Sequence, residues 1–318
     1  MDVTEDELIH AIRRVLSGAG PDVIVPVGDD AAVVRPGSGD LVLTTDALVE
    51  GSHFVRANTT ARDLGAKAIA VNVSDVAAMA GSPRYALCAL TLSGEVDAAW
   101  VMELFGGMRE ACDDYACTLV GGNLARGPEV TIVVTVTGEV APGRAVTRGG
   151  ARVGDRIVVT GELGTAAAGH RIKRAGRRWD QADLDAIRRA DRPQARVGEA
   201  QIVARHGVTA MIDVSDGLSL DLSRLCGASG VGAKVRIHAL PGGPRALPEE
   251  VLGGGEDYEL LATMPSTDAV EAAGAELEEA FGVPLADVGA IVEGEGLTAI
   301  DPHGRERPLP VTGWDHFG

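Results

Sequence analysis

Residues 211–218 read Met-Ile-Asp-Val-Ser-Asp-Gly-Leu, and the second half of the chain is organised around this stretch. The apolar run 208–213 predicts a buried strand, and a helix is expected to begin near Leu218. Two carboxylates and free backbone N–H groups then lie at a helix N-terminus, where a phosphate and its cations can be held together. Simple capping by Ser215 or Asp216 is the alternative, and it is compatible with that role.

Outward from this stretch, the apolar patterns predict alternating strands and helices. In the second half, the predicted strands are 156–160, 208–213, 233–239, 258–264 and 287–292. Two or three helices are predicted after the first of these strands, and another helix before the last. In the first half, the predicted helices are a short one before Gly20, an Ala-rich one at 61–80 and an amphipathic one at 100–115. The predicted strands there are 41–46, 84–92, 118–121 and 130–140.

This order predicts a mixed α/β (α+β) protein with two domains. A chain of 318 residues exceeds the size at which single cores stop growing. The order strand, helix, strand, helix, strand, strand in the first half indicates a sandwich with helices on one face of a sheet. We place the domain boundary in a Gly- and Pro-containing loop, which gives an N-terminal domain of residues 1–147 and a C-terminal domain of residues 148–318.

Composition narrows the class of function. The formal net charge of −17 disfavours nucleic acid and anionic membranes as partners, although cations between protein carboxylates and a phosphate would still permit ATP binding. No apolar run is long enough to cross a bilayer, and the first residues do not resemble a signal peptide. The four cysteines lack metal-ligand spacing and suit reduced thiols. We therefore expect a cytoplasmic protein.

Three turn-like motifs in the first half could carry chemistry. Gly28-Asp29-Asp30 is an acidic turn, and Thr44-Thr45-Asp46 offers hydroxyl and carboxylate oxygens that suit Mg²⁺ at the end of a predicted strand. Gly121-Gly122-Asn123 follows another predicted strand and would let the backbone approach a ligand. Taken alone, each of these motifs is more often an ordinary turn than a binding site.

Asp75 is the most informative residue of the first half. It lies in an apolar helical stretch, on the same face as Asn72. An unpaired carboxylate there is costly, so a bound cation is one explanation. A helix break with Asp75 as the N-cap is the other. In the second half, Gly253-Gly254-Gly255-Glu256 predicts a loop that presents Glu256 to a ligand, or a plain loop.

Together these motifs resemble the thiamine-monophosphate kinase family, in the superfamily of aminoimidazole ribonucleotide synthetase. The resemblance runs from Gly28 to the terminal Gly313-Trp314-Asp315-His316-Phe317. It implies two domains, the N-terminal one ferredoxin-like and pairing in a homodimer. It also implies that ATP phosphorylates thiamine monophosphate directly, with several Mg²⁺ ions, to give thiamine diphosphate and ADP. Another ATP-dependent enzyme of the superfamily is the alternative, as is an inactive nucleotide- or metal-binding protein.

The resemblance also implies roles for individual residues. The implied Mg²⁺ ligands are Asp30, Thr44, Thr45, Asp46, Asp75, Asp213 and Asp216, of which Asp46, Asp75 and Asp216 are taken as catalytic. The implied ATP contacts are Gly122, Asn123, Arg148 and Ser215, and the implied thiamine phosphate contacts are His53, Glu256 and Trp314. The chain departs from the family pattern at Asn123, where many members have aspartate. Asn123 is therefore predicted to contact the nucleotide rather than a metal.

Overall fold

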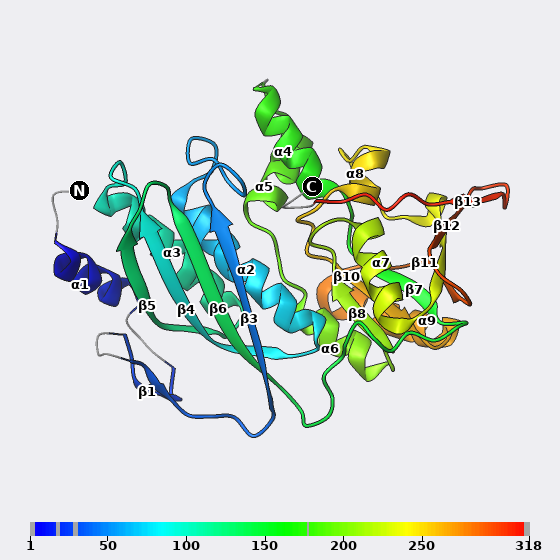
Figure 1. Ribbon diagram of the computed structural model, residues 1–318, viewed down its shortest axis with the longest axis horizontal. Helices are drawn as coiled ribbons and strands as arrows, with labels where there is room; N and C mark the ends of the chain where they lie inside the picture. Colours follow the sequence, from blue (N-terminus) through cyan, green and yellow to red (C-terminus); the bar gives the residue numbers. More distant parts are fainter. Residues whose placement is uncertain (1–3, 17–19, 28–30, 177, 315–318) are drawn as a thin grey trace. The chain divides into compact units, whose positions relative to one another are not determined.

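The computed structural model describes residues 4–16, 20–27, 31–176 and 178–314. The chain divides into two compact units (Figure 1). Unit 1 comprises Met1–Val76 and Gly81–Gly143, and unit 2 comprises Ala77–Ala80 and Arg144–Gly318. Each unit contains helices and a sheet, so the predicted mixed α/β class is confirmed.

Unit 1 is built on a four-stranded sheet with helices on one face (Figure 1). The strands lie in the order β3 (Asp40–Val49), β6 (Thr131–Val140), β4 (Ser82–Leu92) and β5 (Thr118–Arg126). The β4–β5 pair is parallel, and the other two pairs are antiparallel. The covering helices are α2 (Ala61–Ala78) and α3 (Ala98–Asp114).

Strand alternation explains why only one face of this sheet is covered. Successive side chains of a strand point to opposite faces. In β3, Val42 and Leu48 are buried, whereas Leu41 and Leu43 on the other face are 66% and 64% exposed. The apolar residues of β6 alternate in the same way, with a buried row that includes Ile132. The second face of the sheet is therefore open within this unit.

Short elements precede the sheet. Helix α1 (Glu5–Val15) begins with a capping box in which Thr4 and Glu7 exchange hydrogen bonds. Strands β1 (Val23–Val25) and β2 (Val33–Val34) form an antiparallel pair that the sequence patterns did not predict. Two or three residues are too few to establish a recognisable alternation.

Unit 2 contains a seven-stranded sheet. Its strands lie in the order β13 (Glu306–Pro308), β12 (Leu297–Ile300), β9 (Gly232–Arg236), β11 (Leu285–Val292), β7 (Arg156–Thr160), β10 (Leu260–Met264) and β8 (Ala210–Asp213). The helical elements are α4 (Thr165–Ala175), α5 (Gln181–Asp191), α6 (Val197–Arg205), α7 (Leu218–Ser229), η1 (Ile237–Ala239), α8 (Pro248–Gly253) and α9 (Thr267–Phe281).

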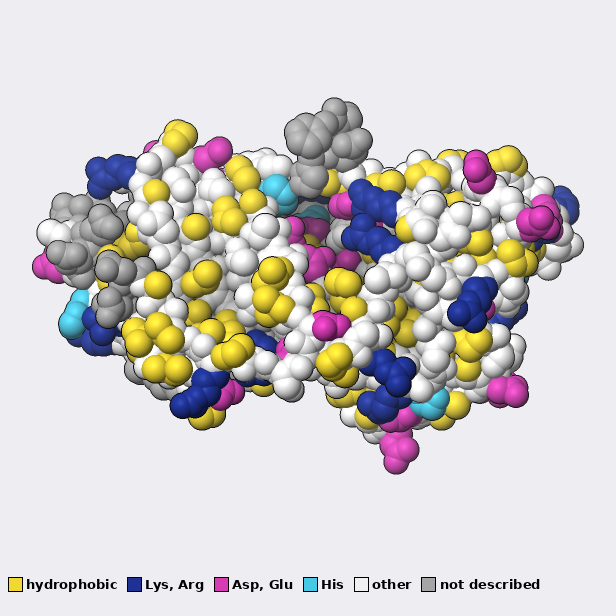
Figure 2. Space-filling view, turned by 60° about the horizontal axis from the view of Figure 1, so that its bottom comes forward, with side chains coloured by type: hydrophobic (Ala, Val, Ile, Leu, Met, Phe, Trp, Pro, Cys, Tyr) yellow, Lys and Arg dark blue, Asp and Glu magenta, His cyan; other side chains and the backbone are white. Residues whose placement is uncertain are grey.

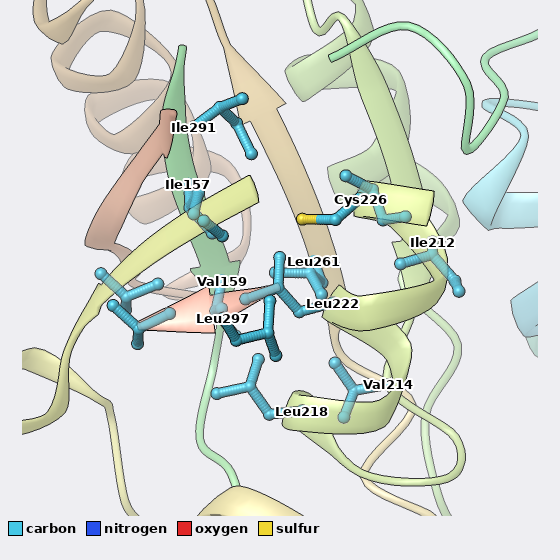
Figure 3. Close-up of a cluster of buried hydrophobic side chains, with 14 of the residues drawn as sticks. Ile157, Val159, Ile212, Val214, Leu218, Leu222, Cys226, Leu261, Ile291 and Leu297 are labelled. Carbon is cyan, nitrogen blue, oxygen red and sulfur yellow. The ribbon is translucent and has the colours of Figure 1, made fainter. Parts of the chain in front are cut away.

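A buried cluster joins α7 to the central strands of this sheet (Figure 3). Leu218 and Leu222 project from the helix toward Val159 and Leu261 of the sheet, and Ile212 joins them from β8. Because these side chains are almost completely inaccessible to solvent, they fix the position of α7 on the sheet. The turn between β8 and α7 is thereby held at both ends.

Two predictions for the second half were incomplete. The Gly- and Pro-rich stretch 241–255 contains α8, which begins with Pro248 at its first turn, a position that suits proline. The short strands β12 and β13 were not predicted. Among the described residues, no helix combines the length and the apolar character required to span a bilayer.

Candidate functional site

The turn between β8 and α7 carries three of the predicted site residues of unit 2. Asp213 is the last residue of β8 and is 2% exposed. Val214 donates its amide to the carbonyl of Glu259 (2.8 Å), and Ser215 accepts at its carbonyl from the amide of Glu256 (2.7 Å). The turn is therefore bound through its backbone to the residues that lead into β10.

Two backbone amides of the turn that leads into α7 are not free, contrary to the expectation from the sequence. Asp221, from the first turn of α7, accepts at Oδ2 from the amides of Asp216 (3.0 Å) and Gly217 (3.1 Å). Gly217 is the N-cap and contributes no side chain, so capping by Ser215 or Asp216 is also wrong. A buried carboxylate of the protein therefore binds two of the amides that were predicted to face a phosphate.

Arg224 completes this cluster, and sequence reasoning missed it together with Asp221. Its Nη1 donates to Asp216 Oδ2 (2.6 Å) and to Asp221 Oδ1 (2.7 Å). Burial raises the pKa of Asp221, whereas the hydrogen bonds from the backbone amides and the charge of Arg224 lower this pKa. Burial opposes the charge on Arg224, but the two carboxylates outweigh it and hold its pKa above the usual value. The spacing of Asp221 and Arg224 by three residues on a predicted helix was the available signal.

The loop before β10 presents Glu256. This residue has a φ of 70°, which is unusual for a residue other than glycine, and Tyr258 has a φ of 52°. Glu256 Oε2 pairs with Nε2 of His170, from α4. The backbone bonds to the β8–α7 turn and this side-chain pair together hold Glu256 beside the turn that carries Asp216.

Asp257, the next residue, is buried against the start of α4. Its two oxygens accept from the amides of Gly164 (2.5 Å) and Ala166 (3.1 Å), so it supplies the cap that Gly164 cannot. Burial raises the pKa of Asp257 to about 7, although the hydrogen bonds from the backbone amides act in the opposite direction. The folded protein therefore binds this proton more tightly than the unfolded chain does.

This pKa predicts a pH-dependent stability. A folded-state pKa above the unfolded value gives stability that is complete below the unfolded pKa and is lost as the pH rises through about 7. From this group alone, we expect the free energy of unfolding to fall by about 2 kcal/mol between about pH 5.5 and about pH 8.5. Urea unfolding of the wild type and Asp257→Asn across this range measures the difference, because asparagine has no proton to lose. Equal declines in both proteins would contradict the prediction.

Trp314 and Arg148 complete the predicted residues of unit 2. The Trp314 amide donates to the carbonyl of Asp216 (2.9 Å), which brings the C-terminal segment to the β8–α7 turn, and its side chain is half exposed. Arg148 is exposed, and its carbonyl accepts from Ser229 Oγ at the end of α7 (2.9 Å). Trp314 therefore lies beside the turn, whereas Arg148 is tied to the opposite end of α7.

In unit 1, the structure brings two predicted ligands together. Thr44 Oγ1 donates to Asp75 Oδ2 at 2.5 Å, which joins the middle of β3 to α2. Helix α2 continues without interruption through Asp75 to Ala78, so the alternative of a helix break at this residue is wrong. A hydroxyl and a carboxylate from separate elements thus form a small oxygen-rich group.

The other two predicted ligands of β3 are Thr45 and Asp46, and their side chains point to opposite faces of the sheet. The strand continues to Val49 because its last residues pair with the start of β6, so Asp46 lies inside the strand and does not end it. Thr44 and Asp46 point to the helix-covered side, whereas the Thr45 hydroxyl faces the open side. There Thr45 Oγ1 donates to the Val134 carbonyl (3.1 Å) and accepts from Thr135 (3.0 Å). The Thr45 hydroxyl therefore lies apart from the Thr44–Asp75 group.

Gly122 and Asn123 also lie inside a strand. They belong to β5, which extends to Arg126, and they do not follow it as predicted. A Cβ atom on Gly122 would lie 1.8 Å from the carbonyl oxygen of Cys88, so glycine is required for the close approach of β4 and β5. Asn123 is exposed. The structure thus explains Gly122 by strand packing, and ligand contact by Gly122 stays a prediction.

His53 lies in the turn after β3. Its Nδ1 accepts from the Val49 amide (3.1 Å), and its own amide donates to the Val49 carbonyl (2.9 Å). This arrangement fixes the imidazole ring near the end of the strand. Asp30 lies outside the described residues, so its predicted role as a ligand stays a prediction.

The donor atoms suit a hard divalent cation. Carboxylate and hydroxyl oxygens are the ligands that Mg²⁺ prefers, and both units provide them. Within the part of the chain that the structure describes, no three His, Cys, Asp or Glu residues are grouped closely enough to hold a metal. The predicted carboxylates are divided between two units, and Asp30 is not among the residues searched. The residues fit Mg²⁺ in chemistry, with one or two ligands from each element.

Comparison with family models shows the class of protein to which the chain belongs. The family model of the AIR synthase related protein, N-terminal domain, matches residues 28–140, and that of the C-terminal domain matches residues 152–302. Together they span most of the chain and place it among the AIR synthase related proteins.

Individual relatives are more specific. The chain is 35% identical to thiamine-monophosphate kinase of Aquifex aeolicus (strain VF5) over an alignment of 328 residues that covers 99% of each protein. It also resembles the crystal structure of thiamine-monophosphate kinase from Stenotrophomonas maltophilia K279a, with a TM-score of 0.83 and 35% identity over 94% of this chain and 97% of that one. AaThiL complexed with AMPPCP and TMP has a TM-score of 0.78 and 34% identity over 98% and 97%. The chain belongs to the thiamine-monophosphate kinase family.

Proposed function

We propose that this protein transfers the γ-phosphoryl group of ATP to thiamine monophosphate, giving thiamine diphosphate and ADP in thiamine diphosphate biosynthesis. The observation that carries this proposal is the 35% identity to a thiamine-monophosphate kinase over 99% of both chains. The likeness to a structure that holds AMPPCP, an ATP analogue, and TMP adds support.

The acceptor chemistry explains which groups the enzyme needs. A phosphate monoester loses its second proton near pH 6, so the attacking oxygen is largely ionised at neutral pH and no general base is required. The difficulty is repulsion between two anions. Each pair of unit charges 4 Å apart repels by roughly 4 kcal/mol at an effective dielectric constant of 20. Positioning and charge neutralisation are therefore the main tasks of the protein.

Oxygen ligands from several elements suit those tasks. Thr44, Asp46 and Asp75 in unit 1, and Asp213 and Asp216 in unit 2, would hold Mg²⁺, with Asp30 and the carbonyl of Thr45 as further candidates. Mg²⁺, when bound, supplies positive charge that offsets the phosphate repulsion. The hydrogen bond from Thr44 orients the Asp75 carboxylate, and the backbone hydrogen bonds of the turn after β8 fix Asp213 and Asp216. These contacts prepare the oxygens before any ligand arrives.

Other residues are assigned to the two substrates. Asn123, Arg148 and Ser215, with the backbone at Gly122, would contact ATP. His53, Glu256 and Trp314 would contact thiamine monophosphate. The half-exposed indole of Trp314 could stack on the thiazolium ring or attract its positive charge. The hydrogen bond between the Trp314 amide and the Asp216 carbonyl would connect the two groups of residues. A cytoplasmic location stays a prediction from the sequence.

We propose a homodimer formed through unit 1, and its open sheet face supports this proposal. Leu41 and Leu43 of β3 and Leu87 of β4 are exposed on this face, at 66%, 64% and 45%. Figure 2 shows hydrophobic side chains at the surface of this unit, on the left of the view. A second copy of the same face would bury such side chains, and an isologous contact needs no other partner.

The dimer proposal predicts the effect of one substitution. Leu43→Asp places a charge in the proposed interface, so we expect sedimentation equilibrium to give the mass of one chain for this variant and of two chains for the wild type. Leu184→Asp, which changes an exposed leucine of α5 in unit 2, is the matched control and should stay dimeric. A wild-type protein with the mass of a single chain would refute the proposal.

The direct test of the proposed function is product analysis. The protein is incubated with ATP, Mg²⁺ and thiamine monophosphate, and the products are separated by ion-exchange chromatography. Equal amounts of thiamine diphosphate and ADP are expected. Formation of AMP, or ADP without a thiamine product, would indicate another ATP-dependent reaction of the superfamily.

A further inference from the structure

Arg224 contacts two carboxylates through a single nitrogen. Its Nη1 lies 2.6 Å from Asp216 Oδ2 and 2.7 Å from Asp221 Oδ1. Asp221 is completely buried, whereas the side chains of Asp216 and Arg224 are 23% and 39% exposed. One guanidinium therefore serves both a fixed internal carboxylate and a partly exposed one.

The fixed carboxylate determines where Arg224 lies. Asp221 cannot turn away, because its Oδ2 accepts from two backbone amides at the start of α7. Arg224 follows one helical turn later, so its pairing with Asp221 directs Nη1 toward Asp216. Charge-assisted bonds of this kind are short and orient both partners. The local sequence thus places a positive charge directly on an oxygen of a candidate Mg²⁺ ligand.

We propose that Arg224 is the resident counter-ion of Asp216: it orients this carboxylate and competes with Mg²⁺ for it. The inference rests on the proposed function, in which Asp216 is a metal ligand. A cation that approaches Asp216 Oδ2 must displace Nη1 or share the oxygen with it. Arg224 is thus a positioning residue that weakens metal binding in the absence of nucleotide. Asp221 anchors it in either state.

An ordinary helical ion pair would make a different prediction. Arg188 and Asp185 on α5 form a pair with the same three-residue spacing, at 3.2 Å, but their side chains are 69% and 54% exposed. Such a pair contributes little and influences no distant ligand. Arg188→Gln therefore removes the same kind of contact in the same unit without touching the β8–α7 turn, which makes it the matched control.

The test measures cation affinity without nucleotide. Mn²⁺, which uses the same oxygen ligands, is titrated into the full chain, and free Mn²⁺ is followed by electron paramagnetic resonance. We expect Arg224→Gln to bind Mn²⁺ roughly tenfold more tightly than the wild type, because a positive charge next to the ligand is removed. Arg224→Lys, which keeps the charge, and Arg188→Gln should bind as the wild type does. Adding Asp216→Asn to Arg224→Gln should abolish the gain.

Each result has a defined meaning. Equal Mn²⁺ affinity in Arg224→Gln and the wild type, weaker binding in this variant, or no binding in any variant would overturn the proposal. If Arg224→Gln does not fold, because Asp221 loses its counter-ion, Asp221→Asn/Arg224→Gln is compared with Asp221→Asn, and the same tightening is expected. Failure of the proposed function is recognised separately, as tighter Mn²⁺ binding in Arg224→Gln with no thiamine diphosphate formed by the wild type.

Discussion

Asp75→Asn is expected to lower kcat for thiamine diphosphate formation roughly a hundred- to a thousandfold, a loss typical for one group that stabilises transition-state charge. Asparagine keeps the size of the side chain and can still accept the hydrogen bond from Thr44. It lacks the negative charge that would hold a cation between the reacting phosphates. The fold should persist, because α2 does not depend on this charge for its helical hydrogen bonds. Steady-state assays with saturating substrates, together with thermal unfolding, measure both quantities.

Asp63→Asn is the control for this substitution. Asp63 lies on the same helix and makes the same kind of contact, a hydrogen bond from the hydroxyl of Thr60 (2.7 Å). It is only partly buried and lies in the first turn of α2, far along the helix from Asp75, so kcat should change less than twofold. Equal effects of the two substitutions, or a wild-type rate in Asp75→Asn, would count against Asp75 as a metal ligand.

Arg196→Met is expected to destabilise unit 2 by about 3–5 kcal/mol, the usual cost of breaking a buried ion pair from one side. Arg196 is 5% exposed and contacts Glu259, which is 1% exposed, through Nε (2.7 Å) and Nη2 (2.5 Å). Burial opposes the charge of Arg196, but Glu259 outweighs it and raises the arginine pKa. Thr160 also donates to Glu259 but cannot replace the lost charge.

Calorimetry measures this effect. A loss of that size corresponds to a fall in Tm of roughly 6–20 °C for a unit of this length. Arg188→Met, which removes an arginine from an exposed pair, should lower Tm by less than about 2 °C. If Arg196→Met and Arg188→Met lower Tm by the same amount, the buried pair of Arg196 and Glu259 does not stabilise unit 2 as predicted.

The sequence predicted the elements with strong apolar patterns, and β7 was located to the residue. Strand β8, with Asp213 at its end, and the helix after Leu218 were also predicted, because apolar runs and a glycine turn mark them locally. The strands β12 and β13 were missed because they are short: β12 is placed by parallel pairing with β9, which is distant in sequence, and β13 pairs with β12. Pairing between distant segments leaves little trace in a local pattern.

The candidate site was predicted less completely than the fold. Residue types suggested Asp75 and Asp216 as candidate ligands, which stay predictions. The extension of β3 past Asp46 was missed because it is set by pairing with β6. The hydrogen bonds from the Asp216 and Gly217 amides to Asp221 were also missed. The expectation there assumed that a glycine turn leaves its amides free, whereas a carboxylate from the following helix turn reaches them.

The most direct measurement for the whole account is the release of ADP before and after removal of divalent cations. The protein is treated with EDTA, desalted, and assayed with ATP in the presence and absence of thiamine monophosphate, and Mg²⁺ is then added back. We expect ADP release to require thiamine monophosphate, to stop after chelation and to return with Mg²⁺. An undiminished rate in the chelated protein would contradict the claim that these dispersed aspartates bring two anionic substrates together through bound cations.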